Sequence, residues 1–303
     1  MNKTIVIIGS SNTDMVIRTP RFPARGETVI GKDFLMNAGG KGANQAVTVA
    51  RLGGNAVFVC RTGNDVFGED AVRLLTNEGI NTSYIRTDSE GASGVAIITV
   101  NNAAENTIVV APGANAQLNE LQIEEAREAI SAAGYALMQL EIPLDTVTYA
   151  AKIAFENKVP IVLNPAPAAT LPDELYKMIS IITPNEKEAT VLTGIEVTDP
   201  VSARRAARAL AGKGVAVVII TMGREGALLY DGHTFTHIKA PAVKAVDTTA
   251  AGDVFNGALV VGLSEGMDLV DAVTFACHAS AVSVTKRGAQ KSVPYRNELP
   301  ALV

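Results

Sequence analysis

Short runs of apolar, largely β-branched residues recur along the chain, and amphipathic segments follow them. The apolar runs lie at residues 4–10, 55–63, 134–141, 159–166, 179–185 and 215–223. Because their apolar positions are continuous rather than alternating, we predict strands buried on both faces of a parallel sheet. Segments with the periodicity of helices, several closed by glycine, lie at residues 44–53, 69–79, 145–158 and 202–214. This alternation predicts an α/β fold.

Two stretches, residues 14–36 and 93–110, break the alternation. The second has two β-rich halves on either side of Asn101 and Asn102, which predicts a hairpin. We expect both stretches to pair into a small sheet that stands off the main body. The sequence has no repeat of fixed period and no linker rich in Pro or Ser, so we expect one domain over residues 1–303 with this sheet inserted as a lid.

The composition narrows the classes of partner. The 303 residues are 48% hydrophobic and 19% charged, which is typical of a globular protein with a sizeable core. A net charge of −5 does not favour nucleic acid or an anionic membrane as partner, so an anionic ligand needs a local site. Cys60 and Cys277 belong to no CxxC motif, which argues against a disulfide framework or a zinc site and favours the cytoplasm. The first apolar run ends at Gly9, too short for a signal peptide or a membrane span.

The segment NAGGKGANQA, residues 37–46, places three glycines and a lysine between a predicted strand and a predicted helix. It does not match the phosphate-binding loop G-x-x-x-x-G-K-[ST], because Leu35 replaces the first glycine and Gly42 replaces the hydroxyl residue. It also lacks the G-x-G-x-x-G spacing of dinucleotide-binding proteins. The glycines indicate either a backbone that closely approaches a ligand or another strand, or a tight turn capped by Asn44. The residues alone leave both interpretations open.

The segment AVDTTAAGDVFNGALVVGL, residues 245–263, leads from small residues into a long apolar helix. Free amides at a helix start, with the positive end of the helix dipole, form a candidate anion hole. Asp253 lies beside it, where the dipole favours an ionised carboxylate that accepts a proton from an attacking hydroxyl. This arrangement favours phosphoryl transfer. The alternative is a first-turn carboxylate that merely suits the helix dipole.

Together, NAGGKGANQA and DTTAAGDVFNGAL resemble the two signatures of the ribokinase family of carbohydrate kinases. Further segments resemble the family in the same order along essentially the whole chain: GSSNTDMV, MQLEIP, LNPAPA, ITPNEKEA, ITMGREGA and KRGAQKSVP. The resemblance implies a three-layer α/β/α sandwich with a mostly parallel central sheet and a small β lid. It also implies ATP-dependent phosphorylation of D-ribose at O5 to give ribose 5-phosphate and ADP.

The resemblance assigns roles to individual residues. Those at its sugar-binding positions are Asn12, Asp14, Gly40, Lys41, Asn44, Glu141 and Asp253, with Asp253 also as general base and Ala250, Ala251 and Gly252 in the anion hole. The glycine stretch then faces the sugar rather than the phosphates. Carboxylates, amides and an ammonium group all pair with the hydroxyls of a sugar. Many members of the wider family carry glycine at the position of Ala250.

The resemblance further implies Mg²⁺ bound with ATP, and K⁺ as a monovalent cation beside the anion hole. The nucleotide positions are Asn185, Glu188, Thr221, Gly223, Gly226, Gly252 and His278, and helix register decides whether Cys277 or His278 faces adenine. The cation positions are side-chain oxygens of Asp247 and Ser292 and carbonyls of Thr249, Ser283, Lys286 and Gly288. An all-oxygen cage suits a hard cation, which would orient the amides of the anion hole.

We expect the lid to close over the sugar and exclude water, and its open strand edges to pair in a homodimer. Two alternatives to a ribose kinase stay open. One is a kinase of the same fold for deoxyribose, fructose or a nucleoside; Asn12 favours ribose, because it can reach a hydroxyl that deoxyribose lacks. The other is a sugar-binding regulatory protein without catalysis, against which the presence of Asp253 and PNEKE argues.

Overall fold

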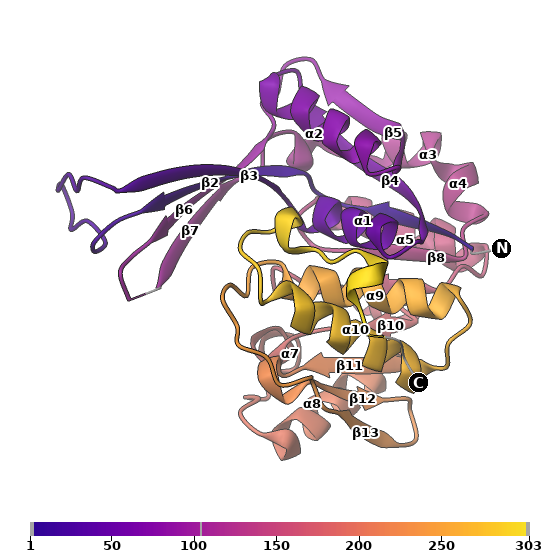
Figure 1. Cartoon of the computed structure of the whole chain (residues 1–303). Coiled ribbons are helices and arrows are strands. Elements are labelled where there is room, and N and C mark those ends of the chain that lie inside the picture. The colour runs from indigo at the N-terminus through magenta and orange to yellow at the C-terminus, as the bar shows by residue number, and fades with distance from the viewer. Residues whose placement is uncertain (1–2, 104, 301–303) are drawn as a thin grey trace.

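The computed structural model describes residues 3–103 and 105–300 and is built around a sheet of nine strands (Figure 1). The strand order is β13-β12-β11-β10-β9-β8-β1-β4-β5. The strands are β1 (Thr4–Ile8), β4 (Asn55–Gly63), β5 (Asn81–Asp88), β8 (Tyr135–Met138), β9 (Ile161–Leu163), β10 (Ile181–Ile182), β11 (Val217–Thr221), β12 (Ala227–Tyr230) and β13 (Phe235–Ile238). Neighbours from β11 to β5 are parallel, and β12 and β13 add an antiparallel edge. The continuous apolar runs therefore form parallel strands, as predicted.

Helices cover both faces of this sheet, which confirms the three-layer α/β/α fold (Figure 1). One face carries α1 (Lys41–Arg51), α2 (Val66–Asn77), α9 (Ala251–Ser264) and α10 (Leu269–Ser283). The other carries α3 (Glu120–Glu125), α4 (Arg127–Ser131), α5 (Leu144–Glu156), α6 (Asp173–Met178), α7 (Glu186–Thr193) and α8 (Pro200–Gly212). Ile5 and Ile7 of β1 pack toward the first set and Val6 and Ile8 toward the second, because successive side chains of a strand point to opposite faces. Short 3₁₀ helices are η1 (Gly113–Gln117), η2 (Gly223–Glu225), η3 (Gln290–Ser292) and η4 (Arg296–Glu298).

A second sheet of four strands extends away from the main body (Figure 1). It has the order β3-β2-β6-β7 and consists of β2 (Asn12–Arg18), β3 (Asp33–Gly39), β6 (Gly94–Val100) and β7 (Asn106–Ala111). The β6–β7 pair is the predicted antiparallel hairpin, and β2 joins it through a parallel ladder with β6. Asn12 pairs with both Gly39 and Gly94, so the root of this sheet adjoins the glycine stretch. Whether it acts as a lid stays a prediction.

The helix after the glycine stretch begins earlier than predicted. It starts at Lys41, and Gly40 rather than Asn44 is the N-cap, with φ 86°. A Cβ at Gly40 would lie 2.7 Å from Asn12 N, so glycine is required for this approach. The interpretation of Asn44 as the cap of a tight turn is therefore wrong, and Asn44 lies inside the first turns of α1.

Within the described residues, no helix is both long enough and apolar enough to cross a membrane.

Candidate active site

Polar side chains gather where the parallel strands end. Asn164 follows β9, Asn185 follows β10, and Thr221 is the last residue of β11. Glu141 lies beyond the end of β8, where its side chain accepts a hydrogen bond from the backbone N of Lys41 at the start of α1. Ligands of parallel α/β sheets bind at this edge because the loops of several strands meet there.

Asp253 lies in the first turn of α9, is 5% exposed, and accepts two hydrogen bonds from α1. Asn44 Nδ2 donates to Asp253 Oδ2 at 2.9 Å, and Gln45 Nε2 donates to Oδ1 at 3.0 Å. Gln45 Nε2 also lies 3.2 Å from Asn164 Oδ1, and Gln45 Oε1 accepts from Gln139 Nε2 at 2.6 Å. These bonds fix the plane of the carboxylate. Each of its oxygens keeps a lone pair for a further proton donor.

The surroundings of Asp253 adjust its proton affinity. Burial raises the pKa of Asp253, while Lys41, Asn44 and Gln45 act in the opposite direction and Glu141 adds to the rise. The outcome is a pKa above the ordinary value for aspartate. A carboxylate with raised proton affinity accepts a hydroxyl proton more readily, which suits a general base.

Lys41 lies among carboxylates that hold it in the charged form. Burial opposes its charge, but Asp253, Glu141, Glu188 and Asp14 together raise the pKa of Lys41. Its ammonium group therefore stays positive beside the carboxylate of Asp253.

Asp14 and Glu141 form the acidic side of the same cluster. Burial, followed by the charges of Glu141 and Asp253, raises the pKa of Asp14 to about 7. Ser10 Oγ donates to Glu141 Oε2 at 2.5 Å and fixes that carboxylate. A Cβ at Gly39 would lie 2.3 Å from Asp14 Oδ2, so the absence of a side chain there makes room for Asp14. Near neutral pH, Asp14 therefore offers a ligand hydroxyl both a donor and an acceptor.

The amide of Asn12 is oriented by Asn115 of η1. Asn115 Nδ2 donates to Asn12 Oδ1 at 2.7 Å, and Asn115 is itself anchored by hydrogen bonds of 2.9 and 3.1 Å to the backbone of Ser11. A Cβ at Gly94 would lie 2.1 Å from Asn12 Oδ1, so glycine leaves room for this pair. Asn12 Oδ1 already accepts a hydrogen bond from Asn115, so Asn12 Nδ2 remains to donate to a ligand.

A cavity of about 850 Å³ extends from Lys41 and Asp253 along the start of α9. Its volume is in the range of small-molecule and cofactor sites. Predicted site residues that line it are Lys41, Asn185, Glu188, Thr221, Gly223, Gly226, Ala250, Ala251, Gly252 and Asp253. Asn44 and Glu141 are joined to Asp253 and Lys41 by the hydrogen bonds above, so these two residues link the polar cluster to the cavity.

The start of α9 offers backbone amides to the cavity. Ala250 is the N-cap and has φ 61°, a left-handed conformation that glycine adopts at lower cost, which explains the glycine of many family members. The amide of Ala251 donates to Thr248 O at 3.2 Å. The amides of Gly252 and Asp253, which a helix start leaves without intrahelical partners, are therefore the donors available for an anion.

Asn185 and Glu188 form a capping box on α7 as well as part of the cavity wall. Glu188 Oε2 and Oε1 accept from Asn185 N and Nδ2, each at 2.9 Å. Burial raises the pKa of Glu188, although Asn185 and Lys41 oppose the rise. Oxygen ligands suit Mg²⁺, and because both carboxylate oxygens already accept hydrogen bonds, a contact through bound water fits this pair.

The register of α10 puts Cys277 rather than His278 against the cavity. Cys277, Ser280 and Ala281 line it, at positions that share one face of a helix. His278 lies about 100° further around the helix, outside this set, and its Nδ1 contacts Thr274 O at 2.9 Å. Its position therefore does not support the predicted role of His278 in nucleotide binding.

A family model described as pfkB family carbohydrate kinase matches residues 2–296. The chain belongs to the pfkB family of carbohydrate kinases. Ribokinase of Haemophilus influenzae is 46% identical over 298 residues, which span 98% of this chain and 97% of that protein. Deoxyribokinase of Salmonella typhi is 37% identical over 291 residues, 96% of this chain and 95% of that protein. A structure of Arabidopsis thaliana ribokinase complexed with ribose and ATP is similar with a TM-score of 0.93 at 32% identity, covering 98% of this chain and 97% of that one.

Membership of the pfkB family makes the chain an ATP-dependent kinase, which implies Mg²⁺ with ATP. The predicted K⁺ ligands lie at the last residue of α10, Ser283, and in two segments, residues 247–249 and 286–292. Asp247 Oδ1 accepts from Thr249 N at 2.9 Å and Oγ1 at 2.6 Å, and Asp247 Oδ2 accepts from Gly288 N at 2.9 Å. Despite partial burial, these bonds lower the pKa of Asp247. Ser292 is fully buried. Asp247 thus joins loops rich in oxygen, a donor set that fits a hard cation.

In the part of the chain that the structure describes, no three His, Cys, Asp or Glu residues gather as a metal site, so a cation here would depend mainly on carbonyl oxygens.

Sequence reasoning missed the amides behind this pfkB-family site. Gln45, Gln139, Asn115 and Asn164 are all buried and hydrogen-bonded to predicted site residues or to each other. Gln45 had one available signal, since it follows Asn44 within the glycine stretch. Gln139 lies in MQLEIP and Asn164 in LNPAPA, two of the segments that resemble the family, whereas nothing in the local sequence distinguishes Asn115.

Proposed function

We propose that this kinase transfers the γ-phosphoryl group of ATP to O5 of D-ribose. The observation that carries the proposal is the position of Asp253, a buried carboxylate fixed by Asn44 and Gln45 between a polar cluster and a cavity. Phosphoryl transfer requires a base, an acceptor hydroxyl and a positive field to meet at one point. Asp253 lines the cavity together with Lys41 and the start of α9.

In this mechanism the O5 hydroxyl gives its proton to a free lone pair of Asp253. The bond from O5 to the γ-phosphorus forms while the bond to the leaving oxygen of ADP breaks. The amides of Gly252 and Asp253, together with the dipole of α9, stabilise the charge on the transferring group. Lys41 stays charged and adds positive potential at the same point.

Asn185 and Glu188 are the residues that we propose to hold Mg²⁺ through bound water, where it would neutralise phosphate charge.

We also propose that K⁺ binds beside Asp247. The carbonyls of Thr249, Ser283, Lys286 and Gly288 and the side-chain oxygen of Ser292 would complete an oxygen cage there. Asp247 favours this assignment because its hydrogen bonds to Thr249 and Gly288 already join these loops.

The sugar would bind on the side of Asp253 that faces Asn12, Asp14, Gly40, Lys41, Asn44 and Glu141. Asn44 Oδ1 is buried and has no hydrogen-bond partner among the described residues, so it is available to a sugar hydroxyl. Asn12 is oriented as a donor by Asn115. A donor that pairs with the 2-hydroxyl is left unpaired by 2-deoxyribose, which favours ribose over the substrate of the deoxyribokinase relative.

Product analysis tests the reaction and its regiochemistry. With MgATP and D-ribose, we expect ADP and a new phosphomonoester whose ³¹P signal is split by two equivalent or nearly equivalent protons, as a primary phosphate at O5 requires. A signal split by one proton would place the phosphate on a secondary hydroxyl. Ribose binding without ADP release would favour the regulatory sugar-binding alternative.

We further propose that the four-stranded sheet is a lid and the contact surface of a homodimer. Seven of its large apolar side chains are at least 44% exposed: Phe34, Leu35, Met36, Ile97, Ile108, Val109 and Val110. An apolar surface on a sheet with open edges is typical of a protein interface. A lid that closes over the sugar would exclude water and limit ATP hydrolysis.

We propose the cytoplasm as the location, which Cys60 and Cys277 support because both are free and buried.

A further inference from the structure

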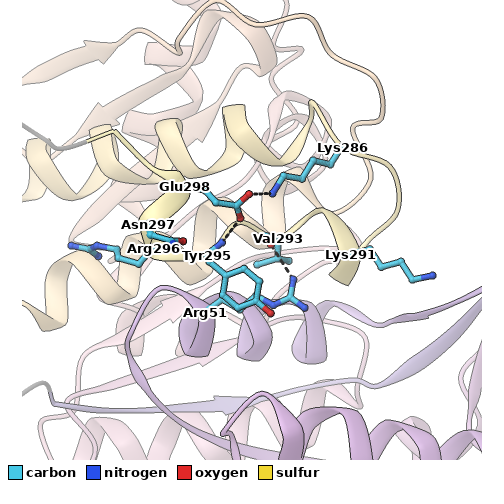
Figure 2. A pocket seen from close by; sticks show the side chains of 8 residues that line it. All are labelled: Arg51, Lys286, Lys291, Val293, Tyr295, Arg296, Asn297 and Glu298. Atoms are coloured by element: carbon cyan, nitrogen blue, oxygen red, sulfur yellow. Dashed lines mark hydrogen bonds and ion pairs between the residues drawn. The ribbon is translucent and has the colours of Figure 1, made fainter.

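Arg51, the last residue of α1, links this helix to two other parts of the chain, and Figure 2 shows it beside Val293 and Tyr295 of one of them. Its Nε and Nη2 donate to the carboxylate of Glu78 at 2.9 and 2.5 Å. Its Nη1 donates to Gln290 O at 2.8 Å and to Val293 O at 3.0 Å, and its guanidinium lies 4.8 Å from the ring centroid of Tyr295. The side chain of Arg51 is only 13% exposed. The planar guanidinium of Arg51 donates to one carboxylate and two carbonyls at once, so its position is fixed.

The carbonyls that Arg51 binds flank Ser292, which is fully buried in η3. They belong to residues 286–298, the segment that also contains Gly288, whose amide binds Asp247. Figure 2 shows the ion pair within this segment, Lys286 to Glu298 at 2.6 Å. Near its other end, Arg296 pairs with Glu265 at 2.9 Å and lies over the ring of Phe275. Arg51 therefore binds the segment on both sides of Ser292 and ties these residues to α1.

The opposite end of α1 holds the catalytic centre. Asn44 and Gln45 donate to Asp253, and the backbone N of Lys41 donates to Glu141. Ten residues of helix separate Lys41 from Arg51, a distance of about 15 Å along a rigid rod. One helix thus contacts both the base and the loop that contains the proposed cation ligands.

We propose that Arg51 is a positioning residue for the cation loop. It holds residues 290–293 so that Ser292 and the carbonyl of Gly288 converge with Asp247, and α1 couples this loop to Asp253. This inference rests on the proposed function for the cation, but the anchoring of the segment by Arg51 is testable without it.

The variants are Arg51→Met, which removes every hydrogen bond of the guanidinium, and Arg51→Lys, which keeps the charge without the fork. The matched control is Arg61→Met. Arg61 also forms a partly buried pair, to Asp88 at 2.9 Å, but it does not contact residues 286–298. Circular dichroism establishes that each variant is folded, and Arg51→Lys serves if Arg51→Met is not.

Limited trypsin digestion reads the segment directly, because Lys286, Arg287, Lys291 and Arg296 are cleavage sites within it. We expect Arg51→Met to be cut in this segment about tenfold faster than wild type, because the substitution removes one charged hydrogen-bonding group that holds the segment. Arg61→Met should keep the wild-type rate there. Unchanged cleavage of the segment in both Arg51 variants would overturn the proposal.

The difference in Tm between KCl and tetramethylammonium chloride at equal ionic strength detects K⁺ binding independently of turnover. We expect K⁺ to raise the Tm of wild type and Arg61→Met but to raise that of the Arg51 variants less. Their half-activating K⁺ concentration should rise about tenfold while KM for ribose changes less than about twofold. A full K⁺ response in Arg51→Met would overturn the coupling. If wild type has no K⁺ response but Arg51→Met is cleaved faster, the cation assignment fails and the anchoring role stands.

Discussion

Asn44 and Gln45 hold the proposed base from consecutive positions. They lie about 100° apart around α1, so their amides reach different oxygens of Asp253. Burial of Asp253 raises its pKa, and these donors limit the rise by stabilising the charged form. The two amides therefore set both the orientation and the ionisation of the carboxylate.

Replacing Gln45 with Leu should move the pH dependence of kcat. Asp253 must be ionised to accept a proton, so the rate falls as the pH falls through its pKa. Gln45 lowers that pKa, and its loss raises it. With Lys41 and Glu141 unchanged, we expect the acidic limb of kcat to move to higher pH by about one unit, equivalent to about 1.4 kcal/mol.

The control for this change is Thr48→Val, one turn further along α1. Thr48 is fully buried and its hydroxyl donates only to Asn44 O, at 2.8 Å. This variant should keep the wild-type pH profile. The assignment is contradicted if Gln45→Leu lowers kcat by the same factor at every pH, because that result reports disturbed packing rather than a changed pKa.

Replacing Asn12 with Met should discriminate between sugars. If Asn12 Nδ2 donates to the 2-hydroxyl, its loss costs about 1.5 kcal/mol with ribose, roughly tenfold in kcat/KM, and less with 2-deoxyribose. Initial rates on both sugars measure this difference. Equal losses on the two sugars would remove the argument for ribose.

At the residue scale, the sequence predicted groups that lie within recognisable motifs, such as Lys41 and Asp253. It did not predict Asn115, because its partner Asn12 lies 103 positions away and only folding brings the two together. Gln45 lies within the glycine stretch, but its contact with Asp253, 208 positions away, was not predicted either. His278 differs by one position from Cys277, and helix register, which a sequence pattern fixes poorly, separates the two.

At the scale of elements, the start of α1 depends on a close approach of two backbones. Gly40 has φ 86° and leaves no room for a Cβ, because Asn12 N and Ser11 Cα would lie 2.7 and 2.8 Å from it. The same glycine lets β2 and α1 meet where the sugar is proposed to bind. The start of α1 and the proposed sugar site therefore both depend on the absence of a side chain at Gly40.

A pair of alanine substitutions separates backbone strain from this steric requirement. Gly79 has φ 78° at the end of α2 and open space where a Cβ would lie, so Gly79→Ala should cost about 1–2 kcal/mol of folding stability. Gly40→Ala should cost about 1–3 kcal/mol more through the added clash and should also raise KM for ribose. Urea unfolding and initial rates measure both. Equal effects of the two substitutions would contradict the steric role of Gly40.

The sequence predicted the existence of most elements, because their apolar patterns are long or bounded by turn residues. It did not predict the parallel pairing of β2 with β6, since the two strands are separated by more than the length of a hairpin and local pattern does not specify such partners. It also placed the start of α1 too late, because Gly42 lies in the first turn of the helix and glycine disfavours helix.

At the scale of the whole molecule, the three-layer fold follows from the alternation of buried strands and amphipathic helices. The four-stranded sheet is different, because it extends from the main body and leaves many of its large apolar side chains exposed (Figure 1). Residues Asn106–Ala111 of β7 are all exposed. This surface is the reason we expect the protein to function as a pair of chains.

Light scattering after size exclusion tests the dimer. We expect a mass of twice 31.6 kDa for wild type and a shift toward monomer for a variant with Ile108→Glu and Val109→Glu. Leu121→Glu is the control, since Leu121 is 77% exposed on α3 of the main body and should leave the mass unchanged. A monomeric wild type at working concentration would rule out the proposed pairing.

The most direct test of the account is ADP release by wild type and Asp253→Asn with MgATP, using D-ribose beside 2-deoxyribose, fructose and adenosine. We predict turnover highest with ribose in wild type and a loss of about 10²–10⁴-fold in Asp253→Asn. Calorimetry should detect ribose binding in both proteins. Undiminished turnover in Asp253→Asn would contradict the assignment of the base, and activity confined to another sugar would contradict the assignment of ribose.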